Sequence, residues 1–167
     1  MGRRLSGQAR PVLLLDGHNL IGRAPGLSLE REEEARELLL RRIGAAKGSG
    51  RRQVVVVFDG NRPGSAKEGA FGGLRVVYSP EGGSADEEIL RRVARERRGQ
   101  ATVVTSDRRL AQRALDLGAA VESCESFLGR LGRHAAGRRD SAPPAAPRLA
   151  PGEVEAWIQA FQGKHKM

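Results

Sequence analysis

Continuous apolar runs alternate with polar segments along the N-terminal part of the chain. The runs at residues 11–16 (PVLLLD) and 53–59 (QVVVVFD) are rich in β-branched residues, and each ends in aspartate. Such runs are typical of strands that are buried on both faces of a parallel sheet. Shorter runs at residues 74–79, 101–107 and 119–123 predict three further strands.

Amphipathic helices are expected between these strands, because apolar residues recur there at helical spacing. The three stripes are Ala35, Leu38, Leu39 and Ile43; then Ile89, Leu90, Val93 and Ala94; and finally Leu110, Ala114 and Leu117. Strands that alternate with helices indicate an α/β sandwich with a mostly parallel central sheet.

The same pattern divides the chain into four segments: a basic N-terminal extension (1–10), a folded domain (11–134), an Ala/Pro-rich linker (135–151), and a short C-terminal helix with a basic tail (152–167). The helix is predicted because Val154, Trp157, Ile158 and Phe161 recur at i, i+3, i+4 and i+7. A helix of about three turns is marginal on its own, so we expect it to rest on the domain or on a partner.

Charge and composition point to a nucleic-acid partner without proving one. The net charge is +9, and most of the basic residues are arginine. A basic surface attracts polyanions, although a GC-rich genome would favour arginine codons equally well. The chain has only six aromatic residues, so shape and backbone charge are expected to outweigh base stacking.

Cysteine content and hydropathy indicate in which cellular compartment the protein is expected. Cys124 is the only cysteine, so no disulfide framework is expected and a reducing compartment fits. No apolar run before Asp16 is long enough for a signal peptide or a membrane span. We therefore expect a cytoplasmic protein that does not enter the membrane.

Four aspartates follow the predicted strands. Asp16 and Asp59 end the first two strands, Asp107 follows the fourth, and Asp86 opens the helix after the third. The carboxyl ends of parallel strands meet at one edge of the sheet, so these side chains are expected to converge there. Taken singly, each has an ordinary explanation in turn chemistry or at a helix N-terminus.

Asp86 is the least easily explained of the four. Ser84 and Glu87 have the spacing of a capping box, which accounts for both of them but not for Asp86. Asp86 instead shares a helix face with Leu90 and Val93, so it is expected to turn inward.

Converging carboxylates repel one another and raise each other's pKa unless a cation relieves them. Mg²⁺ or Mn²⁺ is the expected cation, because both prefer oxygen ligands. An acidic metal pocket on a basic protein suits phosphodiester chemistry, in which arginines hold the flanking phosphates.

Four blocks, in this order, resemble the YacP-like branch of the NYN nucleases, which are relatives of the PIN domain: LLLDGHNLI (13–21), VVVFDG (55–60), GGSADEEI (82–89) and VVTSD (103–107). The resemblance covers residues 11–134. It implies a PIN-like three-layer α/β/α sandwich and a metal-dependent endoribonuclease whose products carry 5′-phosphate and 3′-hydroxyl ends.

The resemblance also implies roles for single residues. Asp16, Asp59, Asp86 and Asp107 would form the metal site and the catalytic centre, and Asn19 and Ser106 match positions beside it. The family pattern usually has tyrosine where His18 stands, so the resemblance assigns His18 no role.

Three basic residues near the acidic edge are candidates for contacts to RNA. Arg62 and Lys67 lie in the Gly-rich segment 60–73, which is expected to be a long loop, and Arg108 follows Asp107. We expect a structured RNA or an RNA–protein assembly, such as the ribosome, to supply specificity. The sequence leaves the RNA target, the number of metal ions and the oligomeric state open.

Two alternatives are weighed against the nuclease. A phosphatase of the haloacid dehalogenase type needs a second acid two residues after Asp16, where this chain has His18. A non-catalytic RNA- or ribosome-binding module that retains the fold would gain nothing from a negative pocket. The complete set of aspartates therefore favours the enzyme.

Overall fold

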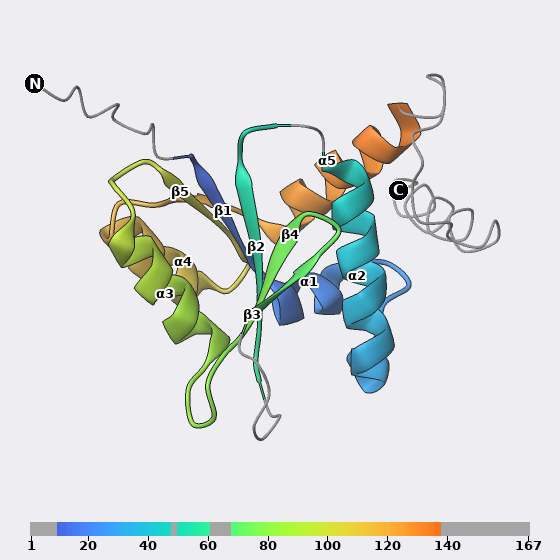
Figure 1. The fold of residues 1–167 in the computed structure, drawn as a ribbon, viewed down its shortest axis with the longest axis horizontal. Coiled ribbons are helices and arrows are strands. Elements are labelled where there is room, and N and C mark those ends of the chain that lie inside the picture. The colour runs from blue at the N-terminus through green and yellow to red at the C-terminus, as the bar shows by residue number, and fades with distance from the viewer. Residues whose placement is uncertain (1–9, 48–49, 61–67, 138–167) are drawn as a thin grey trace, which may run out of the picture.

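The computed structural model describes residues 10–47, 50–60 and 68–137 as one domain (Figure 1). Its strands are β1 (Val12–Asp16), β2 (Gln53–Phe58), β3 (Glu68–Phe71), β4 (Leu74–Tyr78), β5 (Ala101–Val104) and β6 (Ala120–Glu122). Its helices are α1 (Gly17–Arg23), α2 (Glu32–Ala46), α3 (Ala85–Arg95), α4 (Arg108–Asp116) and α5 (Cys124–Gly137), with a 3₁₀ turn at Leu29–Arg31 before α2.

The strands form one sheet in the order β3-β4-β2-β1-β5-β6, in which β3 alone runs antiparallel to its neighbour. β1 lies between β2 and β5, and Leu14 pairs with Val55 on one side and Val103 on the other. All five residues of β1 are buried. This explains why its sequence is continuously apolar up to the final aspartate.

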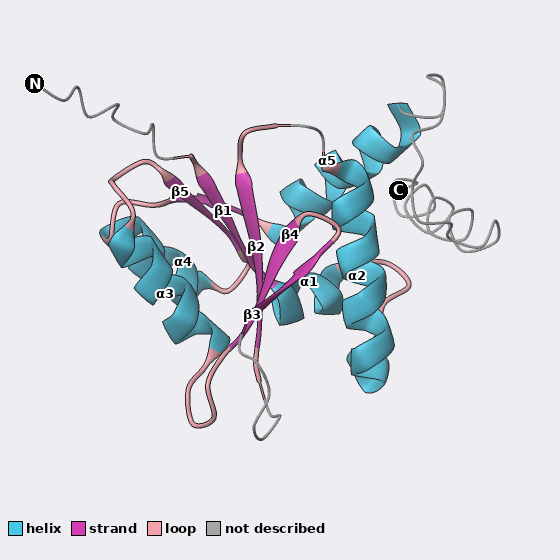
Figure 2. Cartoon of the chain, in the orientation of Figure 1, coloured by secondary structure: helices cyan, strands magenta, loops and turns pink. Residues whose placement is uncertain are grey.

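Helices cover both faces of the sheet (Figure 2). α1, α2 and α5 pack on one face, against side chains that include Leu13, Leu15 and Phe58. α3 and α4 pack on the other face, against alternate residues such as Leu14 and Val57. The predicted α/β fold, with its three layers and mostly parallel central sheet, is confirmed.

Two elements, α1 and β3, differ from the sequence-based expectation. α1 begins directly after Asp16, where the Asp-Gly pair suggested a turn, because the Asp16 carboxylate caps it. β3 occupies the end of segment 60–73, which was expected to be a loop. It pairs with β4 through a turn in which Gly72 and Gly73 both have positive φ.

α5 was not recognised from the sequence, and it continues to Gly137, three residues beyond the expected end of the domain at 134. The remainder of the predicted linker and the predicted C-terminal helix lie outside the described residues. Leu117, expected in the apolar stripe of α4, ends that helix and is 42% exposed. Within the described residues, no helix has both the length and the apolar character that a membrane span requires.

Substitution of Gly17 tests the contact between α1 and the sheet. A Cβ atom on Gly17 would lie 2.3 Å from Cε1 of Phe58 and 2.9 Å from the carbonyl oxygen of Val57. Because Phe58 is fully buried and cannot move aside, we expect Gly17→Ala to lower the free energy of unfolding by about 1–3 kcal/mol.

Gly22→Ala is the matched control within the same helix, because the nearest atom to its Cβ would be Cδ1 of Leu29 at 3.9 Å. This variant should be neutral or more stable by up to about 1 kcal/mol. Urea denaturation of both variants measures the difference, and equal stabilities would contradict the packing explanation.

Candidate active site

The four predicted aspartates lie at the ends of β1, β2 and β5 and at the beginning of α3. Asp16 is the last residue of β1, Asp59 directly follows β2, and Asp107 precedes α4 after β5. Asp86 is the second residue of α3. The negative charges of Asp86 and Asp59 both raise the pKa of Asp16, so the carboxylates are close enough to interact.

Asp16 is buried at the centre of this edge, with 6% of the residue exposed. Its Oδ2 accepts a hydrogen bond from the Thr105 hydroxyl at 3.0 Å, and its Oδ1 accepts one from the Asn19 N–H at 3.5 Å. Burial, followed by the charges of Asp86 and Asp59, outweighs these bonds and raises the pKa of Asp16 to about 6.

Asp59 and Asp107 each bind the start of a helix. Oδ1 of Asp59 accepts a hydrogen bond from the Ala85 N–H at 2.6 Å, which fixes the first turn of α3 against the end of β2. Oδ1 of Asp107 accepts the N–H groups of Arg109 and Leu110 and thereby caps α4. These bonds bring the N-termini of α3 and α4 to the acidic edge.

Asp86 has no such structural duty within the described residues, where no group donates a hydrogen bond to its carboxylate. Ser84 caps α3 instead, as predicted, by accepting the Glu87 N–H at 3.2 Å. Burial raises the pKa of Asp86, followed by the charges of Asp107 and Asp59, while Arg113 opposes the shift. Its carboxylate is thus free to bind a ligand at this edge.

Thr105 is a site residue that the sequence analysis missed. Its hydroxyl donates to Asp16, and its oxygen accepts the backbone N–H of Asp107 at 3.1 Å. It is 2% exposed. A hydroxyl at the end of an otherwise apolar strand was the available signal, because a buried polar group requires a partner.

His18 and Arg36 bind the backbone of Asp59, and Glu32 binds both of them. We call these three residues the α2 brace. Nδ1 of His18 accepts the Asp59 N–H at 3.3 Å, and Arg36 donates to the Asp59 carbonyl oxygen at 3.1 Å. Nε2 of His18 contacts Oε1 of Glu32 at 2.6 Å, which places the ring proton on Nε2. Arg36 also binds Glu32.

The α2 brace is compact and partly buried. The hydrogen bond from His18, followed by the charge of Arg36, holds the pKa of Glu32 below its usual range. The Arg36 guanidinium lies 5.2 Å from the centre of the Phe58 ring and 5.4 Å from that of Tyr78. These contacts fix both backbone groups of Asp59, so they set where its carboxylate lies.

Asn19 and Ser106, predicted beside the site, bind each other. Oδ1 of Asn19 accepts the Ser106 N–H at 3.0 Å and the Cys124 thiol at 3.1 Å. The Ser106 hydroxyl donates to Glu125 and accepts the Cys124 N–H. The two residues therefore join α1, the end of β5 and the start of α5.

Cys124 is not suited to nucleophilic chemistry. Burial raises the pKa of its thiol to about 11, so the thiol is neutral at physiological pH. Its contact with Asn19 makes it part of the framework that supports the site.

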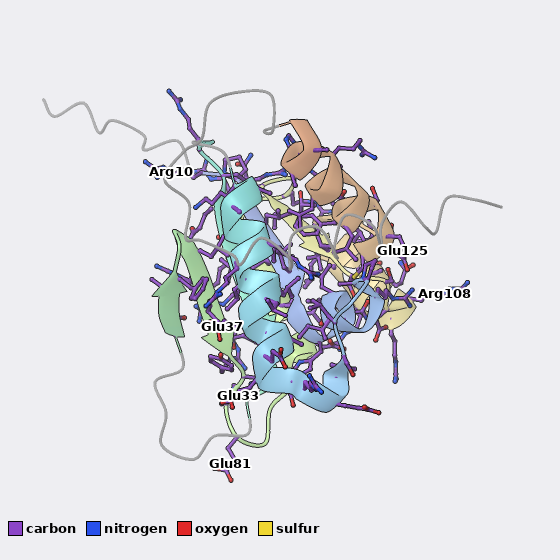
Figure 3. All side chains as sticks on the ribbon, turned by 90° about the vertical axis from the view of Figure 1, so that its right-hand side faces the viewer. Arg10, Glu33, Glu37, Glu81, Arg108 and Glu125 are labelled. Carbon is purple, nitrogen blue, oxygen red and sulfur yellow. The ribbon has the colours of Figure 1, made fainter. Side chains whose placement is uncertain are left out.

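Of the three basic residues predicted to bind RNA, one can be placed. Arg108 is the first residue of α4 and projects from the surface (Figure 3). Arg62 and Lys67 lie outside the described residues.

The carboxylates fit a divalent cation in their chemistry. Within the described residues, no group of three or more His, Cys, Asp or Glu side chains is arranged so that it could hold a metal ion. Hydrogen bonds already draw Asp16, Asp59 and Asp107 toward backbone and threonine donors, and like charges resist a closer approach. Burial raises the pKa of Asp16 and of Asp86, and the neighbouring carboxylates raise both further. Mg²⁺ or Mn²⁺ would neutralise these negative charges with oxygen ligands.

Comparison with known proteins finds relatives of this domain. A family model described as "YacP-like NYN domain" matches residues 13–147. The uncharacterized protein YacP of Bacillus subtilis (strain 168) is 33% identical over 82 residues, which are 47% of this chain and 48% of that protein. The matched stretch therefore spans about half the length of this relative.

Two crystal structures of Rae1 (YacP) from Bacillus subtilis share the fold. One, of a mutant, gives a TM-score of 0.64 at 24% identity and covers 92% of this chain and 96% of that chain. The other gives a TM-score of 0.61 at 25% identity and covers 92% and 88%. Together with the family model, they confirm the resemblance that the four sequence blocks indicated.

The raised pKa of Asp16 predicts a pH dependence of stability. Between about pH 4 and pH 6 the folded protein holds a proton on Asp16 that the unfolded chain has lost, so the free energy of unfolding falls as the pH rises. A shift from 3.8 to about 6 corresponds to about 2–3 kcal/mol. The loss is complete above pH 6.

Asp16→Asn should remove this slope. Denaturation in buffer that contains a chelator, at several pH values between 4 and 7.5, compares the variant with wild type. Asp116→Asn, at the exposed end of α4, is the control and should keep the wild-type profile. A wild-type slope in Asp16→Asn would show that other groups cause the pH dependence.

Proposed function

Because this chain belongs to the YacP-like NYN domain family, whose model matches residues 13–147, we propose that it is a metal-dependent endoribonuclease. The NYN family suggests a PIN-like nuclease fold and an RNA-related function. The finer assignment, hydrolysis of phosphodiester bonds within RNA, is supported chiefly by one observation. Four aspartates lie at strand ends and a helix start along the carboxyl edge of the sheet, and burial, followed by the charges of neighbouring aspartates, raises the pKa of two of them, Asp16 and Asp86.

In this proposal Asp16, Asp86 and Asp107 are the main ligands of Mg²⁺ or Mn²⁺, and Asp59 contributes directly or through water. A bound ion of this kind lowers the pKa of water and stabilises the charge that develops on the phosphate. Asp86 and Asp107 stand at the N-termini of α3 and α4, where the helix dipoles favour negative charge. The same dipoles would favour a phosphate at this edge.

The remaining residues of the site orient these ligands. Thr105 holds Asp16 and the backbone of Asp107 together, and the α2 brace holds the backbone of Asp59. With Cys124 neutral and His18 occupied by Asp59 and Glu32, water is the expected nucleophile. Its attack would leave a 5′-phosphate on one product and a 3′-hydroxyl on the other.

RNA is the proposed substrate, held mainly through its phosphates. The net charge of +9 and the small number of aromatic residues favour recognition of the backbone over recognition of bases. Arg108 beside Asp107, together with Arg62 and Lys67, would bind phosphates on either side of the cleaved bond. We propose that specificity comes from an RNA–protein assembly, with the ribosome as the first candidate.

Titration calorimetry with Mn²⁺ tests the metal site. Wild type should bind Mn²⁺ with micromolar to millimolar affinity, and Asp86→Asn and Asp107→Asn should each lower this affinity at least about tenfold, because each removes a charged ligand. Asparagine also caps helices, so Asp107→Asn should keep α4 intact. Asp116→Asn is the matched control and should bind as wild type.

An RNA cleavage assay on the same variants tests the proposed activity. Messenger RNA bound to ribosomes, and the same RNA alone, should yield fragments with 5′-phosphate ends in Mn²⁺ or Mg²⁺, and Asp86→Asn should abolish them. If Mn²⁺ does not bind even in the presence of a short uncleavable RNA, the nuclease proposal fails, and the non-catalytic RNA-binding module takes its place.

The α2 brace predicts that His18 is a positioning residue for Asp59. His18→Leu removes the acceptor of the Asp59 N–H and should weaken Mn²⁺ binding about 10–100-fold, the usual effect of changing an outer-shell partner. His18→Asn retains a side-chain oxygen near the position of Nδ1 and should recover most of the affinity. Equal losses in the two variants, measured by calorimetry at matched stability, would mean that His18 acts only through packing.

A further inference from the structure

A second feature lies at the opposite end of the sheet from the aspartates. A hollow of about 210 Å³ opens between α5 and the C-terminal end of α2, where α5 passes behind the upper end of α2 (Figure 1). Its apolar lining includes Leu13 and Val54, near the beginnings of β1 and β2, with Ile43, Phe127 and Leu131 from the helices. We call it the back groove.

The rim of the back groove is basic. Lys47, Arg52, Arg130 and His134 line it. Glu122 binds Arg130 through two hydrogen bonds, at 2.7 and 2.9 Å, and its pKa is also lowered by the charge of Arg52. Lys47 donates to the carbonyl oxygen of Gly73, and Arg52 donates to the Thr102 hydroxyl, both neutral acceptors. The three permanent cations Lys47, Arg52 and Arg130 thus have one nearby carboxylate, that of Glu122, so the rim keeps a net positive charge.

Size and chemistry together restrict what the back groove can hold. Sites for small molecules usually have volumes of about 300–1,000 Å³, so a hollow of about 210 Å³ is small for a nucleotide or a cofactor. It is suited to one or two large apolar side chains. A basic rim around apolar walls favours an amphipathic segment with acidic residues beside its apolar face.

The chain itself carries a segment of this kind. Residues 152–162, outside the described part, place Val154, Trp157, Ile158 and Phe161 on one helical face. At about 100° per residue, Glu153 lies on one side of this apolar stripe and Glu155 on the other. The segment therefore combines aromatic anchors with one carboxylate along each border.

The position of α5 makes an internal contact readily reachable. α5 ends at Gly137, three residues after His134, which lies on the rim. Residues 138–151 connect this point to the segment, and each residue can span up to about 3.6 Å. A tethered segment meets its site at an effective concentration of order millimolar, so even weak docking would be populated.

We propose that residues 152–162 dock as a helix in the back groove of their own chain. Trp157 and Phe161 enter the hollow, and Glu153 and Glu155 face Lys47 and Arg52. The contact covers the end of the sheet remote from Asp16 and leaves the acidic edge open. It stands independently of the proposed nuclease activity.

Trp157 is the only tryptophan of the chain, so it reports on this contact in the full-length protein. In wild type its fluorescence should be blue-shifted and protected from acrylamide. Lys47→Glu combined with Arg52→Glu should shift the emission to the red and raise the quenching constant several-fold. Glu153→Lys combined with Glu155→Lys should do the same, and all four changes together should restore protection.

Arg95→Glu combined with Arg97→Glu is the matched control. It makes the same change of charge at exposed positions at and just beyond the end of α3, which packs on the other face of the sheet, and should leave Trp157 unaffected. Far-UV circular dichroism checks that every variant is folded.

Three results would overturn the proposal. Trp157 could be exposed in wild type. It could be protected but insensitive to both charge reversals, which would place it elsewhere. It could also be protected only at protein concentrations at which light scattering detects a dimer, which would assign the groove to the tail of a second copy.

Discussion

The burial of one carboxylate at the end of the central strand constrains the rest of the acidic edge. Asp16 ends β1, which has a parallel neighbour on each side and no exposed residue. A charge in this position loses most of its hydration, and the few hydrogen bonds available do not fully replace it. The pKa of Asp16 has therefore risen to about 6, and the neighbouring residues of the acidic edge pack against a carboxyl group that is costly to ionise.

The charges of neighbouring aspartates make ionisation of Asp16 still less favourable. Backbone N–H groups partly offset the charges of these neighbours. Asp59 binds the start of α3, and Asp107 caps α4, so two of the negative charges are partly neutralised by N–H groups and helix dipoles. Asp86 receives no such bond within the described residues, and its pKa is also raised. Burial and neighbouring carboxylates thus both disfavour the charged forms of Asp16 and Asp86.

The sequence was sufficient for five of the six strands and for the positions of the four aspartates after strands or at a helix start, because both depend on local pattern. Continuous β-branched runs marked β1 and β2, and aspartates at strand ends have only one edge to share in a parallel sheet. The elements that were missed depend on tertiary contacts. β3 is glycine-containing and mostly exposed, so only its pairing with β4 makes it a strand, and the glycines of α5 interrupt the apolar period by which a helix is recognised.

The same distinction holds within the site. Thr105 and the α2 brace escaped notice because their partners are distant in sequence: Thr105 bonds to Asp16 across 89 positions and His18 to the Asp59 backbone across 41. No spacing rule connects residues so far apart. The acids could be proposed singly from the sequence, whereas their contacts with Thr105 and with the α2 brace become visible only in the fold.

The parallel sheet also separates charge between its two ends. Helices that connect parallel strands run opposite to them, so their N-termini gather at the carboxyl edge and their C-termini at the other. Acids are favoured at the first edge and bases at the second. This agrees with Asp86 and Asp107 at one end and Lys47 and Arg52 at the other. The helix N-termini thus favour the carboxylates of Asp86 and Asp107 at the carboxyl edge of a basic protein, while Lys47 follows the C-terminus of α2 at the other end.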